Sequence, residues 1–179
     1  MNPIKNKKDL ETTIDDIRNF AYLYLEKYSS SKQQLRTYLF KKLIKKKQKI
    51  SSKKEIFNLI DTVIFSLVDQ KFLSDEYYSD AKSKAFLRRG YSLNKIRYNL
   101  IKRGIDEKYI KASISKIKEN ESDPDFFSAI KICKRRRIGP CREESNRPLF
   151  YKKDISILAR SGFSYEISKK VLEIPKKEF

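Results

Sequence analysis

One sequence motif occurs twice in nearly the same form and a third time in part. The copies read Ser31-x3-Leu35-Arg36-x2-Leu39-x-Lys41-x2-Ile44, then Ser92-x3-Ile96-Arg97-x2-Leu100-x-Lys102-x2-Ile105, and finally Leu158-x-Arg160-x-Gly162-Phe163. They follow one another at similar intervals, which is typical of a small helical unit used several times in tandem. The sequence therefore predicts an elongated all-α array rather than a single globule. Arrays of this kind more often bind long partners than catalyse reactions.

Apolar residues recur with the period of an α-helix along nearly the whole chain, and no segment predicts a strand. The predicted helices fall into three groups, which we expect to be three-helix repeats at residues 10–73, 74–119 and 124–174. A polar, acidic segment at 119–124 predicts a linker before the third repeat, and residues 141–148 predict a loop within it.

Residues that can cap a helix mark several of the predicted helix starts. Thr13, Ser52, Ser92 and Ser164 each precede an apolar stripe, and Ser52 forms a capping box with Glu55.

Apolar stripes then predict which face of each helix lies in the core. In the first repeat these residues are Ile14, Ile17, Ala21, Leu25 and Tyr28, then Leu35, Leu39 and Leu43, and then Ile56, Leu59, Ile60, Val63, Ile64, Leu67 and Val68. The fourth helix carries Tyr77, Tyr78, Ala81, Ala85 and Phe86. Gly104 and Gly162 are expected to close helices in the left-handed conformation.

The chain is strongly basic along its whole length. It has 42 Lys and Arg residues against 23 Asp and Glu residues, a formal net charge of +19, and basic residues exceed acidic ones in each predicted repeat. A positive field along the full length suits a polyanion or an acidic protein surface as the partner. The alternative is a solvated, lysine-rich surface without a specific partner.

The residue types needed for common catalytic and metal sites are scarce. The chain has no histidine and only two cysteines, and its four glycines are isolated, so no phosphate-binding glycine loop exists. We therefore expect no enzyme activity, no metal and no cofactor. The first residues lack an apolar leader segment and no apolar run is long enough to span a membrane, which predicts a cytoplasmic chain without a membrane partner.

Exposed basic residues at predicted turns and helix ends are the candidate contacts for a partner or for DNA, because Arg and Lys bind phosphates and carboxylates. They are Lys41, Lys42, Lys45, Lys46, Lys47, Arg88, Arg89, Arg97, Lys102, Arg103, Lys134, Arg135, Arg136, Arg137, Arg142, Arg147, Lys152 and Lys153. The run at 134–137 also has a simpler interpretation, as charge that favours a helix C-terminus. Tyr22, Tyr91 and Tyr98 lie off the clearest stripes and could stack on bases.

Several short segments, in order, carry a family resemblance. They are Ala21-x3-Leu25, Ser31-x3-Leu35-Arg36, Phe72-Leu73-Ser74-Asp75-x-Tyr77, Arg88-Arg89-Gly90-Tyr91-Ser92-x3-Ile96-Arg97-x2-Leu100-x2-Arg103-Gly104-Ile105 and Leu158-x3-Gly162-Phe163-x3-Ile167. Together they resemble the RecX family, the regulators of RecA recombinase. Three features depart from the family pattern. Lys71 stands where glycine is common, Ser79 stands where alanine usually follows the aromatic residue, and the stretch from Lys45 to Lys54 is longer and more lysine-rich than typical.

The resemblance implies three tandem three-helix repeats in a curved arrangement. It also implies a monomer that binds the RecA filament on single-stranded DNA and suppresses strand exchange, ATP hydrolysis and co-protease activity, in DNA repair, homologous recombination and the SOS response. Direct, weak binding to nucleic acid is part of the same expectation. The main alternative is a general basic DNA-binding protein that acts without RecA, and a scaffold with incidental charge is a third.

Overall fold

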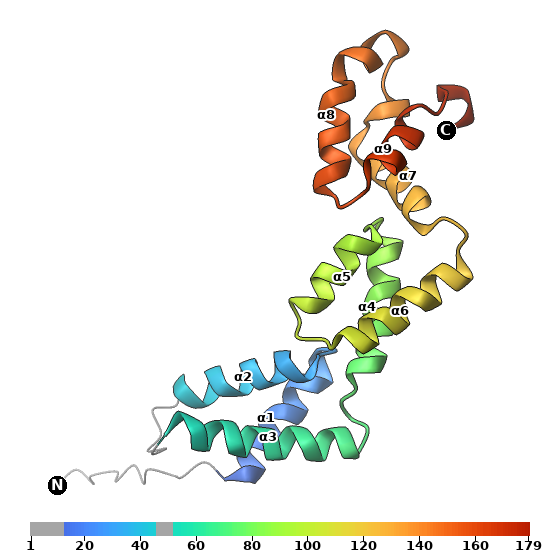
Figure 1. The fold of residues 1–179 in the computed structure, drawn as a ribbon. Coiled ribbons are helices and arrows are strands. Elements are labelled where there is room, and N and C mark those ends of the chain that lie inside the picture. Colours follow the sequence, from blue (N-terminus) through green and yellow to red (C-terminus); the bar gives the residue numbers. More distant parts are fainter. Residues whose placement is uncertain (1–12, 46–51) are drawn as a thin grey trace, which may run out of the picture. The chain divides into compact units, whose positions relative to one another are not determined.

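The computed structural model describes residues 13–45 and 52–179, and over these residues the chain is all-helical with no strand (Figure 1). The α-helices are α1 (Ile14–Lys27), α2 (Lys32–Lys45), α3 (Lys53–Asp69), α4 (Asp75–Arg88), α5 (Leu93–Ile101), α6 (Glu107–Asn120), α7 (Pro124–Arg136), α8 (Arg147–Arg160) and α9 (Tyr165–Leu172). The predicted all-α class is confirmed. Backbone contacts divide the chain into two compact units, Met1–Tyr78 and Ser79–Phe179. The division into three repeats stays a prediction.

The first unit is built around the apolar faces of α1, α2 and α3. The predicted core leucines Leu35, Leu39 and Leu43 are all buried, because they recur every four residues along one face of α2. Ile14 and Tyr28 were predicted to lie on the core stripe of the first helix, but both are exposed, since they stand at the start of α1 and just after its end. Val68 was also predicted to lie in this core, but 37% of it is exposed. Its neighbour Leu67 takes the inward position, and adjacent helical residues point in directions about 100° apart.

The predicted caps are present at four helix starts. Thr13 accepts a hydrogen bond from the Asp16 amide and the Asp16 side chain accepts one in return, a complete capping box. The side chains of Ser52, Ser92 and Ser164 each accept a hydrogen bond from the backbone amide three residues later. Local capping chemistry therefore fixes where these helices begin.

Five helices end in the same way, with one residue in the left-handed conformation. These residues are Lys71 (φ 61°), Gly90 (φ 78°), Gly104 (φ 70°), Arg137 (φ 53°) and Gly162 (φ 90°). In each case the amide of the following residue donates to the carbonyl five residues earlier, at 2.9–3.2 Å. This is the Schellman motif, which satisfies carbonyls that a helix end leaves without partners. The predictions for Gly104 and Gly162 are confirmed, and Lys71 and Arg137 adopt a conformation that favours glycine.

The α4 helix differs from its sequence prediction. Tyr78 and Phe86 are buried, but Tyr77 is 77% exposed and Ala81 is also exposed. Ser79 and Ser83 are buried instead. In the second unit Ser113 Oγ on α6 lies 2.9 Å from Ser79 Oγ, and Ser79 Oγ donates to the Tyr109 carbonyl. Small polar residues thus replace apolar ones where α4 and α6 meet.

Two boundaries in the third helix group also differ from prediction. Pro124 is the first residue of α7, where its missing amide hydrogen has no cost, so the linker is only residues 121–123. One short 3₁₀ turn, Gly139–Cys141, reaches the start of the predicted loop at 141–148, and another, Glu144–Asn146, lies within it. The α8 helix already begins at Arg147. A proline at the second position of α8 is compatible with the helix for the same reason.

Polar contacts join the start of α5 to the third helix group within the second unit. Ser92 Oγ donates to the Ser161 carbonyl at 2.9 Å, and the Leu93 amide donates to the Asp125 carboxylate at 2.7 Å. Gly90 also packs directly on α7, since an added Cβ there would lie 3.0 Å from Lys131 Cβ. These contacts bring the ends of α4, α7 and α8 next to α5.

Candidate functional site

A basic pocket lies where these helix ends meet, with a volume of about 400 Å³. Four cationic side chains line it: Lys95, Arg135, Arg136 and Arg160. The rest of the lining is Gly90, Tyr91, Ile132, Ile157 and Ser161. We call this set the basic pocket. Its size lies within the usual range for ligand sites, about 300–1,000 Å³.

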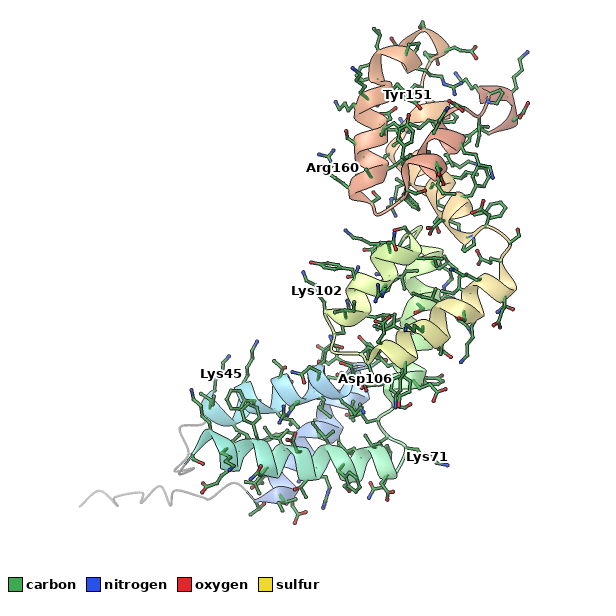
Figure 2. All side chains as sticks on the ribbon, in the orientation of Figure 1. Lys45, Lys71, Lys102, Asp106, Tyr151 and Arg160 are labelled. Carbon is green, nitrogen blue, oxygen red and sulfur yellow. The ribbon has the colours of Figure 1, made fainter. Side chains whose placement is uncertain are left out.

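The four cationic side chains lie on three helices, α5, α7 and α8. Arg135 and Arg136 lie in the last turn of α7, and Arg160 is the last residue of α8, where the helix dipole favours positive charge. Figure 2 shows Arg160 at the end of α8, with its side chain directed away from the helix axis. Lys95 is half-buried in the first turn of α5.

The described residues provide no carboxylate partner for the charge in the pocket. Among the described residues, no ion pair involves Lys95, Arg136 or Arg160, and no carboxylate lines the pocket. Arg135 donates one hydrogen bond to the Arg89 carbonyl at 2.9 Å, which orients its guanidinium. Converging cations of this kind favour an anionic ligand with several acceptor oxygens.

Two of the arginines predicted as contacts are instead engaged inside the protein. Arg142 forms a bidentate salt bridge with the buried Asp154, with both nitrogen–oxygen distances at 2.8 Å. These hydrogen bonds raise the pKa of the Arg142 guanidinium. Arg147 donates to the carbonyls of Leu172 and Ile174, at 2.5 and 2.8 Å. Both side chains therefore hold the third helix group together.

Three predicted contacts in the second helix group also have partners on the protein. Arg97 pairs with Glu107 at 2.9 Å, and Arg103 donates to the Asn99 carbonyl at 2.7 Å. Lys102 lies over the ring of Tyr98, which is 53% exposed. The Lys102–Tyr98 pair stays at the surface, so it can still contact a partner.

The other predicted contacts that the structure describes are exposed, on helix ends or on α8. They are Lys41, Lys42, Lys45, Arg88, Arg89, Lys134, Arg137, Lys152 and Lys153, together with Arg135 and Arg136 of the basic pocket. Lys46 and Lys47 lie outside the described residues. Of the whole predicted set, only Arg135 and Arg136 line the basic pocket.

Sequence reasoning did not select Lys95 or Arg160. Arg160 could have been found, because it lies two residues before Gly162, as Arg88 lies two residues before Gly90. Lys95 carries no such signal, since its role depends on α8 being packed beside α5.

A second cavity, of about 380 Å³, lies between α4 and α6 and has mixed charge. Asp80 there accepts hydrogen bonds at 2.5 Å from both Lys116 and Ser113. Burial raises the pKa of Asp80, but these hydrogen bonds outweigh burial and hold its pKa below the usual value. Two carboxylates, Asp80 and Glu121, line this cavity and Asp80 pairs with Lys116, so the cavity is a weaker candidate for binding an anion.

The described residues offer little for catalysis or metal binding. No group of three or more Cys, Asp or Glu side chains within residues 13–45 and 52–179 could hold a metal ion. Burial raises the pKa of the Cys133 thiol to about 12, so it stays protonated near neutral pH. No helix in the described part of the chain is long and apolar enough to cross a membrane.

Comparison with known proteins gives consistent results in sequence and in structure, although no model of a protein family matches the chain. The regulatory protein RecX of Myxococcus xanthus (strain DK1622) is 28% identical over 164 residues, covering 88% of this chain and 84% of that protein. RecX of Agrobacterium fabrum (strain C58) is 24% identical over 161 residues, covering 90% of this chain and 84% of that protein.

Solved structures with the same fold carry the same name. The crystal structure of RecX from Lactobacillus salivarius superposes with a TM-score of 0.62 at 19% identity, covering 89% of this chain and 94% of that one. A second crystal structure of regulatory protein RecX also gives a TM-score of 0.62, at 18% identity, covering 90% of this chain and 74% of that one. In sequence and in fold, the chain is similar to RecX regulatory proteins, as its motifs predicted.

Proposed function

We propose that this protein binds the RecA filament on single-stranded DNA and modulates RecA, mainly by inhibiting strand exchange, ATP hydrolysis and co-protease activity. It would act as a cytoplasmic monomer in the control of DNA repair, recombination and the SOS response. The observation that carries the proposal is the similarity to RecX regulatory proteins along about nine-tenths of the chain.

The charge distribution supports this proposal. A RecA filament on DNA presents many copies of one protein surface along a polyanion, and a basic chain with cationic clusters in both units can make several weak contacts with it at once. Linked weak contacts raise the overall affinity without a strong single site. Long-range attraction between opposite charges also speeds the first encounter.

The basic pocket favours a second candidate, a DNA-binding protein that acts without RecA. The DNA-dependent ATPase of the cognate RecA separates the two functions. A filament regulator inhibits at far less than one molecule per RecA protomer, whereas a protein that only masks DNA inhibits when the DNA is nearly covered. Masking also weakens steeply with salt, because DNA binding releases counterions.

A further inference from the structure

The basic pocket is the strongest unassigned site in the molecule, because cations from three helices converge there beside apolar surface. We propose that it binds the backbone phosphates of single-stranded nucleic acid, and so forms the DNA contact of the second unit. This inference rests on the proposed function, since the RecA filament is where the protein would meet single-stranded DNA. It adds Lys95 and Arg160, which sequence analysis did not select.

The side-chain chemistry of the lining matches phosphate. Arg136 and Arg160 are exposed and have no ion pair among the described residues. Each planar guanidinium can therefore donate two hydrogen bonds to the oxygens of a phosphate. Lys95 adds a point charge. Arg135 is oriented by its bond to the Arg89 carbonyl and keeps further N–H groups for a ligand. The phosphate of a phosphodiester has only hydrogen-bond acceptors, and the Lys and Arg side chains of the pocket have only donors, so the two match.

The same chemistry disfavours an acidic peptide. Among the side chains that line the pocket, none is a carboxylate or an amide that could accept hydrogen bonds from peptide N–H groups. The hydroxyls of Tyr91 and Ser161 are the only side-chain acceptors in this lining, and Ser161 uses its own hydrogen to donate to the Ile157 carbonyl at 2.9 Å. A peptide would leave its own donors poorly satisfied, which is costly in a partly enclosed site.

The size and the apolar part of the lining favour a strand over an isolated anion. A volume of about 400 Å³ is larger than one phosphate group needs, and Ile132 and Ile157 offer apolar surface beside the cations. A nucleotide sugar or base can lie on such a surface while its phosphate meets the arginines. These contacts do not read base edges, so binding should be independent of sequence.

The test is the binding of a fluorescein-labelled oligothymidylate to the full chain, followed by anisotropy over a series of salt concentrations. The variant is Arg136→Gln/Arg160→Gln. The control is Lys111→Gln/Lys118→Gln, which removes the same charge from exposed positions of α6. Circular dichroism verifies that both variants fold.

Removing two phosphate contacts should lower the slope of log affinity against log salt by about 1.4, since each contact on a single strand contributes about 0.7. We expect binding about tenfold weaker for the pocket variant, with the control near wild type. Equal slopes for variant and control would overturn the proposal, as would binding of dTMP as tight as that of the oligonucleotide.

The RecA ATPase assay keeps this inference separate from the proposed function. Failure of the wild-type protein to inhibit RecA would reject the regulator, while the oligonucleotide slopes would still decide the pocket. A pocket variant that binds the oligonucleotide normally but no longer inhibits RecA would overturn phosphate binding and assign the pocket to an acidic protein surface.

Discussion

Gly162 lies so close to Ser92 that a Cβ on the glycine would stand 2.5 Å from the serine hydroxyl oxygen. That hydroxyl caps α5 and also donates to the Ser161 carbonyl at 2.9 Å. The turn after α8 therefore fits onto the start of α5 only because residue 162 has no side chain. Since this contact places Arg160 beside Lys95, the glycine also shapes the basic pocket.

We therefore predict that Gly162→Ala destabilises the protein by about 2–4 kcal/mol, combining left-handed strain with displacement of the Ser92 hydroxyl. Gly104→Ala is the matched control, because Gly104 is exposed and has a similar φ of 70°. Gly104→Ala should lower the free energy of unfolding by only about 1 kcal/mol, because it adds backbone strain without a steric clash. Urea unfolding measures both, and equal losses would contradict the close contact.

Lys71 occupies a left-handed helix end with φ of 61°, a conformation that glycine adopts without strain. Lys71→Gly should raise the free energy of unfolding by about 0.5–1 kcal/mol, because strain is relieved in the folded state. Lys71→Ala keeps the strain and should leave stability near wild type. A thermal unfolding series distinguishes the variants, and a destabilised glycine variant would show that the Lys71 side chain contributes more than its backbone costs.

Arg142 is predicted to be a stability residue rather than a partner contact. Arg142→Ala leaves the buried Asp154 carboxylate without its main partner and should cost about 3 kcal/mol. Lys152→Ala, at an exposed position nearby on α8, should change stability by less than about 0.5 kcal/mol. Chemical unfolding measures the stability of both variants. If Arg142→Ala had an effect as small as that of Lys152→Ala, Arg142 would again be a candidate partner contact.

Asp80 should make stability depend on pH. Its pKa is lowered in the folded protein, so its carboxylate stabilises the fold above its ordinary pKa of 3.8, and this contribution is lost as the pH falls through the folded value. Asp80→Asn should cost about 1 kcal/mol near pH 7, a value limited by solvent screening. At a pH below the lowered pKa of the folded state the wild type and the variant should converge. A difference that is constant with pH would mean that the carboxylate charge is not responsible.

The arginine run should matter more for RecA than the basic residues near the N-terminus. Replacing Arg135, Arg136 and Arg137 by Ala should weaken RecA inhibition more than replacing Lys5, Lys7 and Lys8, which lie outside the described residues. Each triple variant removes three positive charges, and the RecA ATPase assay measures how much inhibition each one loses. Because Arg137 has φ of 53°, Arg137→Gly separates charge loss from folding, since it removes the cation and relieves strain. Equal losses from the two triple variants would reject the run as a contact.

Local chemistry explains which parts of the fold the sequence predicts. Caps such as Thr13 and Ser92 act on amides three residues away, so they are visible without the tertiary structure. The leucine stripe of α2 is equally local. The buried serines of α4 were missed because Ser79 and Ser83 look like surface residues until α6 is packed against them.

The candidate site is less predictable for a similar reason. The arginines of α7 stand out as a run, but Lys95 and Arg160 are far apart in sequence, and only the packing at Gly90 and Gly162 brings them together. Conversely, Arg142 looks like a surface cation until its pairing with the buried Asp154 is seen. Charge can be counted from a sequence, whereas pairing and convergence need the fold.

The measurement that tests the central claim most directly is the DNA-dependent ATPase of the cognate RecA, with this protein titrated below one molecule per protomer. The account predicts strong inhibition at these substoichiometric levels, persisting at salt concentrations that abolish binding of the protein to bare DNA. Inhibition that begins only when the DNA is nearly saturated, and disappears with salt together with DNA binding, would contradict the RecA regulator and leave a basic DNA-binding protein with a RecX fold.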